Sequence, residues 1–193
     1  MTDVDASALR DEPVEVTVTA SELVYEGRVW DVRSDTFVYG DDEIVRQYVD
    51  HPGAAAVVAI DDRERVLLIQ QYRHPIGHRD WEIPAGLLDI AGEPPIDAAR
   101  RELAEEADLD AERIEPLLSV FTTPGGNDEV VHIFLARGLR PASATFAREA
   151  EEADIRVEWV PLDDAVEAVM SGRMRNGILV AGILAAAELL RRS

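Results

Sequence analysis

Three glutamates, Glu102, Glu105 and Glu106, lie close together in a segment of helix-forming residues. Residues three and four apart share one face of a helix, so these carboxylates fall within roughly a 100° arc. Like charges at this spacing destabilise a bare helix by about 0.3 kcal/mol for each pair. A divalent cation reverses this repulsion, and ligands that are all oxygen favour Mg²⁺, Mn²⁺ or Ca²⁺ over zinc. The spacing therefore indicates a site for a hard cation of the kind that enzymes share with substrate phosphates.

The same three carboxylates also fit an ordinary acidic helix surface. Such a surface would be laced by ion pairs, such as Asp97 with Arg101 and Arg101 with Glu105. Acidic helix faces are common, so carboxylate spacing alone favours the surface interpretation. The neighbouring arc of the helix is apolar, with Ile96, Ala99, Leu103 and Ala107. We therefore expect a helix from about Pro95 to Ala107 that packs this stripe and points its carboxylates into an adjoining cleft.

The net charge excludes some partners and constrains others. The 193 residues carry 39 acidic and 19 basic side chains, for a formal charge of −20, and all the basic side chains are arginine. Such a surface repels phosphate backbones, so a nucleic-acid partner is disfavoured. An anionic small-molecule substrate would need a bound cation. Most of the acids are expected to form a solvated surface.

Several features predict a cytoplasmic protein without a membrane partner. Cysteine is absent, which excludes disulfides, thiolate metal sites and cysteine nucleophiles and suits a reducing compartment. The N-terminus is acidic where a signal peptide would be basic. The longest apolar run, Ile178 to Ala187, is too short to span a bilayer, and we expect it to be a core helix.

The first 50 residues are expected to form a small β unit. Residues 1–13 are polar and resemble a loose tail. Between residues 14 and 50, short β-type runs alternate with Gly and Asp turn residues: VEVTVTA, RVWDV, DTFVY and EIVRQYV. We expect these runs to be strands of an antiparallel unit, followed by a main domain over residues 51–193.

The main domain is predicted to be α+β, an αβα sandwich with a mixed sheet. The runs AAAVVAI and RVLLIQQYR are apolar and are expected to be buried, with DDRE as a hairpin turn between them. Further strands fit EPLLSVF, VVHIFLA and IRVEWVPL, and helical patterns cover Asp163–Ser171 and Asn176–Arg191. This mixture of strands and helices lacks the regular βαβ alternation of an α/β fold, and it therefore favours the α+β class.

The string from Gly86 to Leu109 resembles the Nudix box, a loop-helix-loop that carries a Gly, a downstream Glu and an Arg-Glu-apolar-x-Glu-Glu core. These residues are Gly86, Glu93 and the run from Arg101 to Glu106. Two departures occur: six residues instead of five separate Gly86 from Glu93, and Asp108 stands at the closing Gly. Asp is among the residues that tolerate the left-handed conformation at a helix end.

The resemblance implies a bound Mg²⁺, for which Mn²⁺ could substitute. Glu102 and Glu106 would be the main ligands, assisted by Glu105 and by the carbonyl of Ala85. Arg101 and Glu93 would brace the helix. The alternatives for these last two are a surface ion pair of little energetic worth and a favourable interaction with the helix dipole.

Segments outside the box narrow the resemblance to bacterial ADP-ribose pyrophosphatases. Pro124 lies fifteen positions after the box. Further similarity comes from IQQYRHP, WEIPAGLLD, EEADIRVEW and SGRMRNGILVAG, which together cover most of residues 43–190. The implied reaction is hydrolysis of the pyrophosphate of ADP-ribose, a nucleotide sugar, to AMP and ribose 5-phosphate. The alternatives are another substrate (a sugar nucleotide, NADH or a dinucleoside polyphosphate) and a non-catalytic module that binds ADP-ribose.

The similarity also implies roles for residues outside the box. Arg73 would contact the substrate's phosphates, for which its planar fork is suited, although a surface arginine at a strand end is an equal alternative. Glu82 would contact a ribose or the base, and Glu129 is either another polar contact or merely a loop acid. A catalytic glutamate is expected in the acidic loop after the box, where we prefer Glu152, then Glu151, over Glu149, with Glu106 also counted as catalytic.

Relatives of this type often form intertwined homodimers in which N-terminal strands complete the partner's site. The β unit of residues 14–50 suits that role. Val29 or Trp30 would then pack against adenine. For Trp30 we favour the alternative, an aromatic in the core or at the dimer interface, because large aromatics dominate both.

Overall fold

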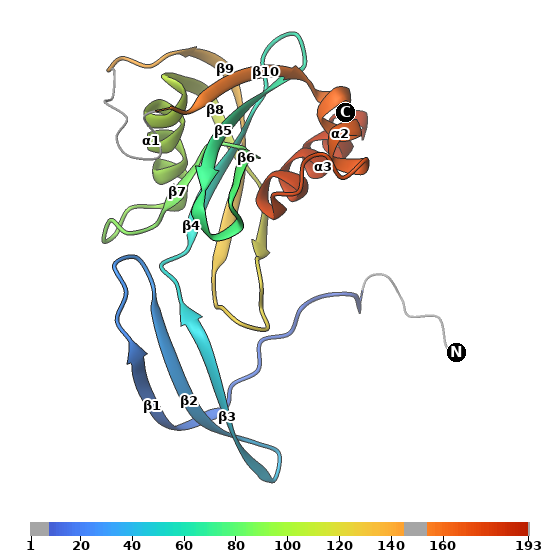
Figure 1. Ribbon diagram of the computed structural model, residues 1–193. Coiled ribbons are helices and arrows are strands. Elements are labelled where there is room, and N and C mark those ends of the chain that lie inside the picture. The colour runs from blue at the N-terminus through green and yellow to red at the C-terminus, as the bar shows by residue number, and fades with distance from the viewer. Residues whose placement is uncertain (1–7, 145–153, 193) are drawn as a thin grey trace. The chain divides into compact units, whose positions relative to one another are not determined.

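The computed structural model describes residues 8–144 and 154–192. The chain divides into two compact units, Met1–Asp50 and His51–Ser193 (Figure 1). Within the described residues, none of the helices is long and apolar enough to cross a membrane.

The first unit is an antiparallel sheet of three strands in the order β1-β2-β3. The strands are β1 (Thr17–Tyr25), β2 (Asp31–Tyr39) and β3 (Asp42–Asp50). The predicted antiparallel unit is confirmed. The prediction of separate strands for RVWDV and DTFVY was wrong, because both contribute to β2 and residues 28–30 lie before it. Ser34 and Asp35, residues typical of turns, are paired in register with β3 instead.

This first unit has no core of its own in the described residues, since none of residues 8–50 is buried. Many of its large apolar side chains are exposed, among them Leu23, Val24, Tyr25, Val29, Trp30 and Val45. Trp30 is 44% exposed, so of the two expected places for it, a core or a dimer interface, the core was wrong and the interface stays a prediction. A thin sheet leaves both faces open, and only packing against another layer buries such side chains.

The second unit contains two sheets. One is mixed, in the order β7-β4-β9-β8, with β4 (Ala54–Ala59) parallel to β9 (Val130–Pro141) and antiparallel to β7 (Ala85–Leu87). Its edge strands are β7 and β8 (Leu109–Phe121). The other sheet is antiparallel, in the order β10-β5-β6. It consists of β5 (Arg65–Arg73), β6 (His78–Glu82) and β10 (Arg156–Pro161), with a short 3₁₀ turn at His74–Ile76.

The predicted hairpin of β4 and β5 was wrong in its pairing. The turn itself forms, and the Asp61 N–H donates to the Arg65 carbonyl at 3.0 Å. Beyond it only one bridge, Ile60 with Val66, joins the two segments. Each strand then enters a different sheet, because β7 and β9 already satisfy both edges of β4.

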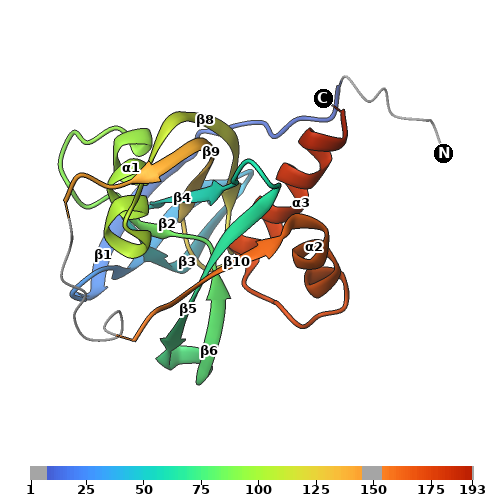
Figure 2. The same ribbon diagram turned by 90° about the horizontal axis from the view of Figure 1, so that it is seen from above.

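The sheets are covered by helices on both sides, which confirms the αβα sandwich. Figures 1 and 2 show α1 (Pro95–Ala107) on one side and α2 (Leu162–Met170) and α3 (Gly177–Arg192) on the other. Strand β4 alternates between the two cores. Ala56 and Val58 pack in the cluster that contains α2 and α3, whereas Ala55 and Val57 pack with α1. This period of two places β4 in the centre of the domain.

Candidate active site

Helix α1 begins and ends as the box pattern predicts. Pro94 precedes it and Pro95 is its first residue, where the missing N–H is not needed. Asp108 closes it in the left-handed conformation, with φ 55° and ψ 31°, and donates its N–H to the Ala104 carbonyl at 3.1 Å. The aspartate that replaces the closing glycine therefore adopts the glycine's conformation.

Glu102 lies directly over Gly86 of strand β7. A Cβ atom on Gly86 would stand 2.0 Å from the Cδ and Oε1 atoms of the Glu102 carboxylate, far inside van der Waals contact. Glycine is therefore the residue that lets the helix bring this carboxylate against the strand. The Glu102 side chain is largely buried there, although it is ionisable.

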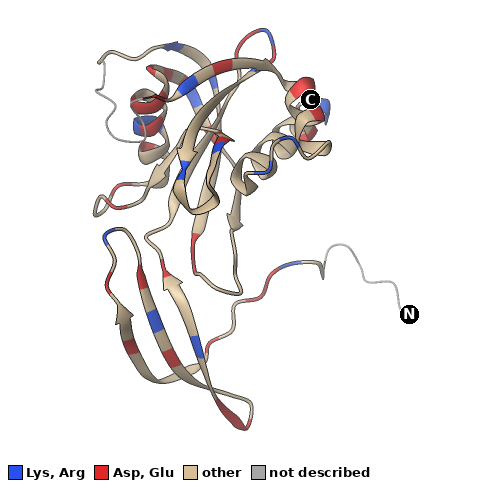
Figure 3. Cartoon of the chain, in the orientation of Figure 1, with Lys and Arg blue, Asp and Glu red and all other residues tan. Residues whose placement is uncertain are grey.

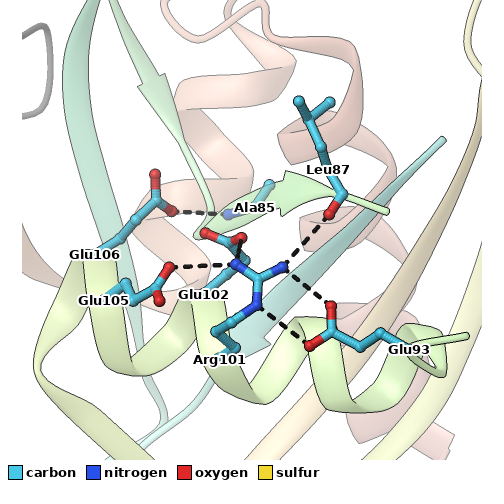
Figure 4. Close-up of polar contacts among 7 residues, drawn as sticks. All are labelled: Ala85, Leu87, Glu93, Arg101, Glu102, Glu105 and Glu106. Carbon is cyan, nitrogen blue, oxygen red and sulfur yellow. Dashed lines mark hydrogen bonds and ion pairs between the residues drawn. The ribbon is translucent and has the colours of Figure 1, made fainter. Parts of the chain in front are cut away.

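Glu106 is held one turn further along the same face. Its Oε2 atom accepts a hydrogen bond from the backbone N–H of Ala85 at 2.8 Å (Figure 4), and the residue is only 4% exposed. This contact uses the N–H of Ala85, whereas the resemblance assigned a role to its carbonyl. Two carboxylates of α1 thus meet two successive residues of β7.

Arg101 joins the other acidic residues of the box (Figure 4). Its guanidinium donates to both oxygens of Glu93, at 3.3 and 3.1 Å, and to Glu105 at 3.2 Å. It also donates to Glu102 and approaches the Leu87 carbonyl at 3.5 Å. The hydrogen bonds to Glu93 raise the pKa of Arg101, an effect that burial partly opposes. The arginine therefore stays charged and ties helix, loop and strand together.

The donor chemistry of this cluster suits a hard divalent cation, because it consists of carboxylates and backbone carbonyls. In the described residues no three acidic or histidine side chains converge closely enough to hold an ion. Glu102 and Glu105 instead share one nitrogen of Arg101, Nη1. Figure 3 shows acidic and arginine segments interspersed over the described chain, and α1 carries both.

Arg73 and Glu82 contact each other across the β5–β6 pair. Nε and Nη2 of Arg73 each donate to a different oxygen of Glu82, both at 2.7 Å. The hydrogen bonds to Glu82 raise the pKa of Arg73, burial opposes the effect, and the charges of Glu106 and Asp80 add to it. Arg73 is thus electrostatically linked to the box, and this fork-like pairing is strong and directional.

Gln71 was missed by the sequence analysis. It is 3% exposed and donates from Nε2 to the Glu82 carboxylate at 3.3 Å, so Glu82 is held from two sides. The signal that would have found it is its position in β5, two residues before Arg73 and therefore on the same face of the strand.

Glu129 lies in the loop that joins β8 and β9, as does Pro124. Its Oε2 atom accepts a hydrogen bond from the Thr122 hydroxyl at 2.6 Å, and its Oε1 atom lies 3.6 Å from Nδ1 of His51. The Thr122 hydroxyl therefore engages the Glu129 carboxylate within the loop, whereas Nδ1 of His51 accepts the Gly53 N–H and does not donate to it. Val29 and Trp30 belong to the first unit. Glu149, Glu151 and Glu152 lie outside the described residues.

Comparisons with known proteins agree with this arrangement. The NUDIX domain model matches residues 50–179. The chain is 42% identical over 167 residues to an ADP-ribose pyrophosphatase of Mycobacterium tuberculosis, and the matched region covers 86% of this chain and 80% of that protein. It is 36% identical over 160 residues to an ADP-ribose pyrophosphatase of Bacillus subtilis, with 82% of this chain and 85% of that protein covered. The chain therefore belongs to the NUDIX domain family.

A solved structure shares the fold. The crystal structure of an ADP compounds hydrolase superposes with a TM-score of 0.76 at 22% sequence identity, covering 94% of this chain and 97% of that chain. At this level of identity the likeness concerns the fold. It confirms the predicted Nudix-type αβα architecture with an additional antiparallel sheet.

Proposed function

We propose that this protein hydrolyses the pyrophosphate bond of ADP-ribose and releases AMP and ribose 5-phosphate. The observation that carries the proposal is the packing of α1 on β7, where Glu102 lies over Gly86 and Glu106 accepts the N–H of Ala85. This arrangement places two largely buried carboxylates of α1 against the start of β7, and such oxygen ligands suit a divalent cation that binds substrate phosphates. The choice of ADP-ribose as the substrate rests on the relatives that are named ADP-ribose pyrophosphatases.

We propose that Mg²⁺, or Mn²⁺ in its place, binds to Glu102, Glu105 and Glu106 and to the carbonyl of Ala85. Members of the family generally use divalent metal ions, and a donor set of oxygens alone suits these two. When bound, such an ion supplies charge for the pyrophosphate oxygens and makes a coordinated water more acidic. Arg101 and Glu93 hold the glutamates in place, since Arg101 contacts Glu102 and Glu105 together.

The remaining side chains bind the substrate and activate water. Arg73 presents its guanidinium to the phosphates while Glu82 fixes its orientation, and Glu82 itself faces a ribose or the base. A glutamate of the loop after the box, Glu152 or else Glu151, orients or deprotonates the attacking water. No covalent intermediate with the protein is needed for a direct attack of water on phosphorus.

We also propose that the protein is a cytoplasmic homodimer. The described part of the first unit buries none of its residues and exposes apolar side chains on all three strands. A second copy of the chain would cover them, with Trp30 or Val29 at that interface or against adenine. Sedimentation at several concentrations tests the dimer, and a mass of one chain at all concentrations would rule it out.

The reaction is tested by measuring AMP release from ADP-ribose, ADP-glucose, NADH and diadenosine polyphosphates, each with Mg²⁺ and with EDTA. We expect metal-dependent cleavage that is fastest on ADP-ribose. A different best substrate would retain the family chemistry and reject ADP-ribose. Tight binding of ADP-ribose with no cleavage under any condition would indicate a binding module instead of an enzyme.

A further inference from the structure

The segment His51-Pro52-Gly53, which begins the second unit, is fixed by hydrogen bonds to two loops that are distant in sequence. The backbone N–H of His51 donates to the Asp128 carboxylate at 2.8 Å, in the β8–β9 loop. The carbonyl of Gly53 accepts the N–H of Leu88 at 3.1 Å, in the loop of the box. The segment thus lies between the two loops and is bonded to both.

The segment is also fixed internally. The N–H of Gly53 donates to Nδ1 of His51 at 3.1 Å, which closes a tight turn around Pro52. Gly53 has φ +84°, a conformation that other residues adopt only under strain. A Cβ at this position would also stand 3.1 Å from the Val130 carbonyl. The turn is therefore specific to glycine and packed against the start of β9.

The β8–β9 loop directs its own carboxylates to this segment. Glu129 lies 3.6 Å from His51, and their side chains are only 16% and 12% exposed. The Thr122 hydroxyl and the Asn127 side chain, which accepts the Glu129 N–H at 3.3 Å, complete the network. Both acids that follow the Pro-Gly-Gly turn are thus engaged with the protein itself.

We propose that Asp128 and Glu129 are positioning residues: Asp128 ties the β8–β9 loop and its Pro124 to the segment His51-Pro52-Gly53, and Glu129 holds the loop itself through Thr122 and Asn127. This inference rests on the proposed function and replaces the role of Glu129 as a direct substrate contact. These hydrogen bonds hold the β8–β9 loop, through Asp128, and the loop of the box, through Leu88, to one segment of the second unit. Substrate groups that contact these loops then meet a preformed surface, which lowers the entropy lost on binding.

The test compares Asp128→Ala with the matched variant Asp128→Asn, whose amide oxygen still accepts the His51 N–H. Hydrogen exchange of peptides covering residues 50–54 measures the protection that the hydrogen bond from His51 to Asp128 provides, independently of enzymatic activity. We expect exchange about ten-fold to a hundred-fold faster in Asp128→Ala, the equivalent of one hydrogen bond to a charged group, and near wild type in Asp128→Asn. Thr122→Val, which removes a donor to Glu129, is a second variant on the same network.

Steady-state kinetics on ADP-ribose separates positioning from catalysis. We expect KM to rise about five-fold in Asp128→Ala with kcat within about two-fold, and Asp128→Asn to restore KM. Unchanged exchange in both Asp128→Ala and Thr122→Val would overturn the tie. A KM as poor in Asp128→Asn as in Asp128→Ala would show that the charge itself acts on the substrate, and would also overturn the proposal. If the wild type cleaves no ADP-ribose, the proposed function fails, while the exchange data still decide whether the tie exists.

Discussion

The carboxylate of Glu102 occupies the space that a Cβ atom on Gly86 would need, with only 2.0 Å between them. One residue comes from α1 and the other from the short strand β7, so this contact sets how closely the helix approaches the strand. The neighbouring contact of Glu106 with the Ala85 N–H, at 2.8 Å, then follows one turn further along. The absence of a side chain at Gly86 is thus a steric requirement for the position of the Glu102 carboxylate.

Gly86→Ala should displace the Glu102 carboxylate and impair the metal site while leaving the core intact. A misplacement of about 1 Å at a catalytic centre costs about a hundred-fold in rate, so we expect kcat/KM to fall by that order. Gly177→Ala is the matched control, because a Cβ at Gly177 meets nothing within 4 Å. Steady-state rates of both variants test this, and wild-type activity in Gly86→Ala would refute the steric role of the glycine.

Arg73→Met should both destabilise the protein and impair catalysis, and these effects can be separated. The variant leaves the buried Glu82 without its fork-like partner, which we expect to cost about 1–3 kcal/mol in the free energy of unfolding. Adding Glu82→Gln removes the stranded charge and should restore part of that stability without restoring activity. Urea unfolding and kinetics of the single and double variants measure this. Recovery of activity along with stability would show that Arg73 does not act on phosphates.

Arg101→Lys should loosen the packing of the box and its metal site, although the substitution preserves the positive charge. Lysine lacks the planar fork that contacts Glu93 twice and reaches Glu105 and the Leu87 carbonyl as well. We expect a loss of about 1 kcal/mol in the free energy of unfolding. We also expect weaker Mg²⁺ binding, seen as a higher Mg²⁺ concentration for the half-maximal rate. Arg113→Lys, on an exposed ion pair, is the control. Equal behaviour of the two variants in unfolding and in Mg²⁺ titrations would argue against the bracing role.

The stability that Asp110 contributes, through its contacts with Arg100 of α1 and Arg140 of β9, should be lost at acid pH. The hydrogen bond from Arg140 lowers the pKa of Asp110, and Arg100 of α1 donates to the same carboxylate. A carboxyl group whose pKa is lower in the folded than in the unfolded state stabilises the fold at pH values above its unfolded-state pKa, which is about 3.9 for Asp. This stabilisation is lost as the pH falls through the folded-state pKa. The stability difference between wild type and Asp110→Asn should therefore be constant above about pH 5 and shrink below pH 4. Urea unfolding from pH 6 to pH 3 checks this, and a difference that grows on acidification would contradict it.

The sequence predicted those parts of the molecule that depend on local patterns. The prolines at the start of α1, its apolar stripe and the left-handed Asp108 follow from short-range rules, and the structure agrees within a residue or two. The pairing of β4 and β5 did not follow, because a turn such as Asp61–Arg65 specifies a reversal of the chain and not which strands pair. Strand partners depend on long-range packing, which the sequence expresses only weakly.

The contacts of the site were predictable only where a motif named them. Glu102 and Glu106 were found from their spacing and the box. The pairing of Arg73 with Glu82 was not, because it joins two strands through their register. The anchoring of His51 by Asp128 joins residues 77 positions apart, and no local pattern signals it.

The most direct test of the central claim is the Mg²⁺ dependence of AMP release from ADP-ribose by wild type and Glu106→Gln. The substitution removes a charge without changing side-chain size, and Glu158→Gln on the exposed face of β10 is the control. We expect wild type and the control to show saturable activation that EDTA abolishes, and Glu106→Gln to lose turnover by about three orders of magnitude with an unchanged melting temperature. Wild-type turnover in Glu106→Gln would contradict the proposed metal site.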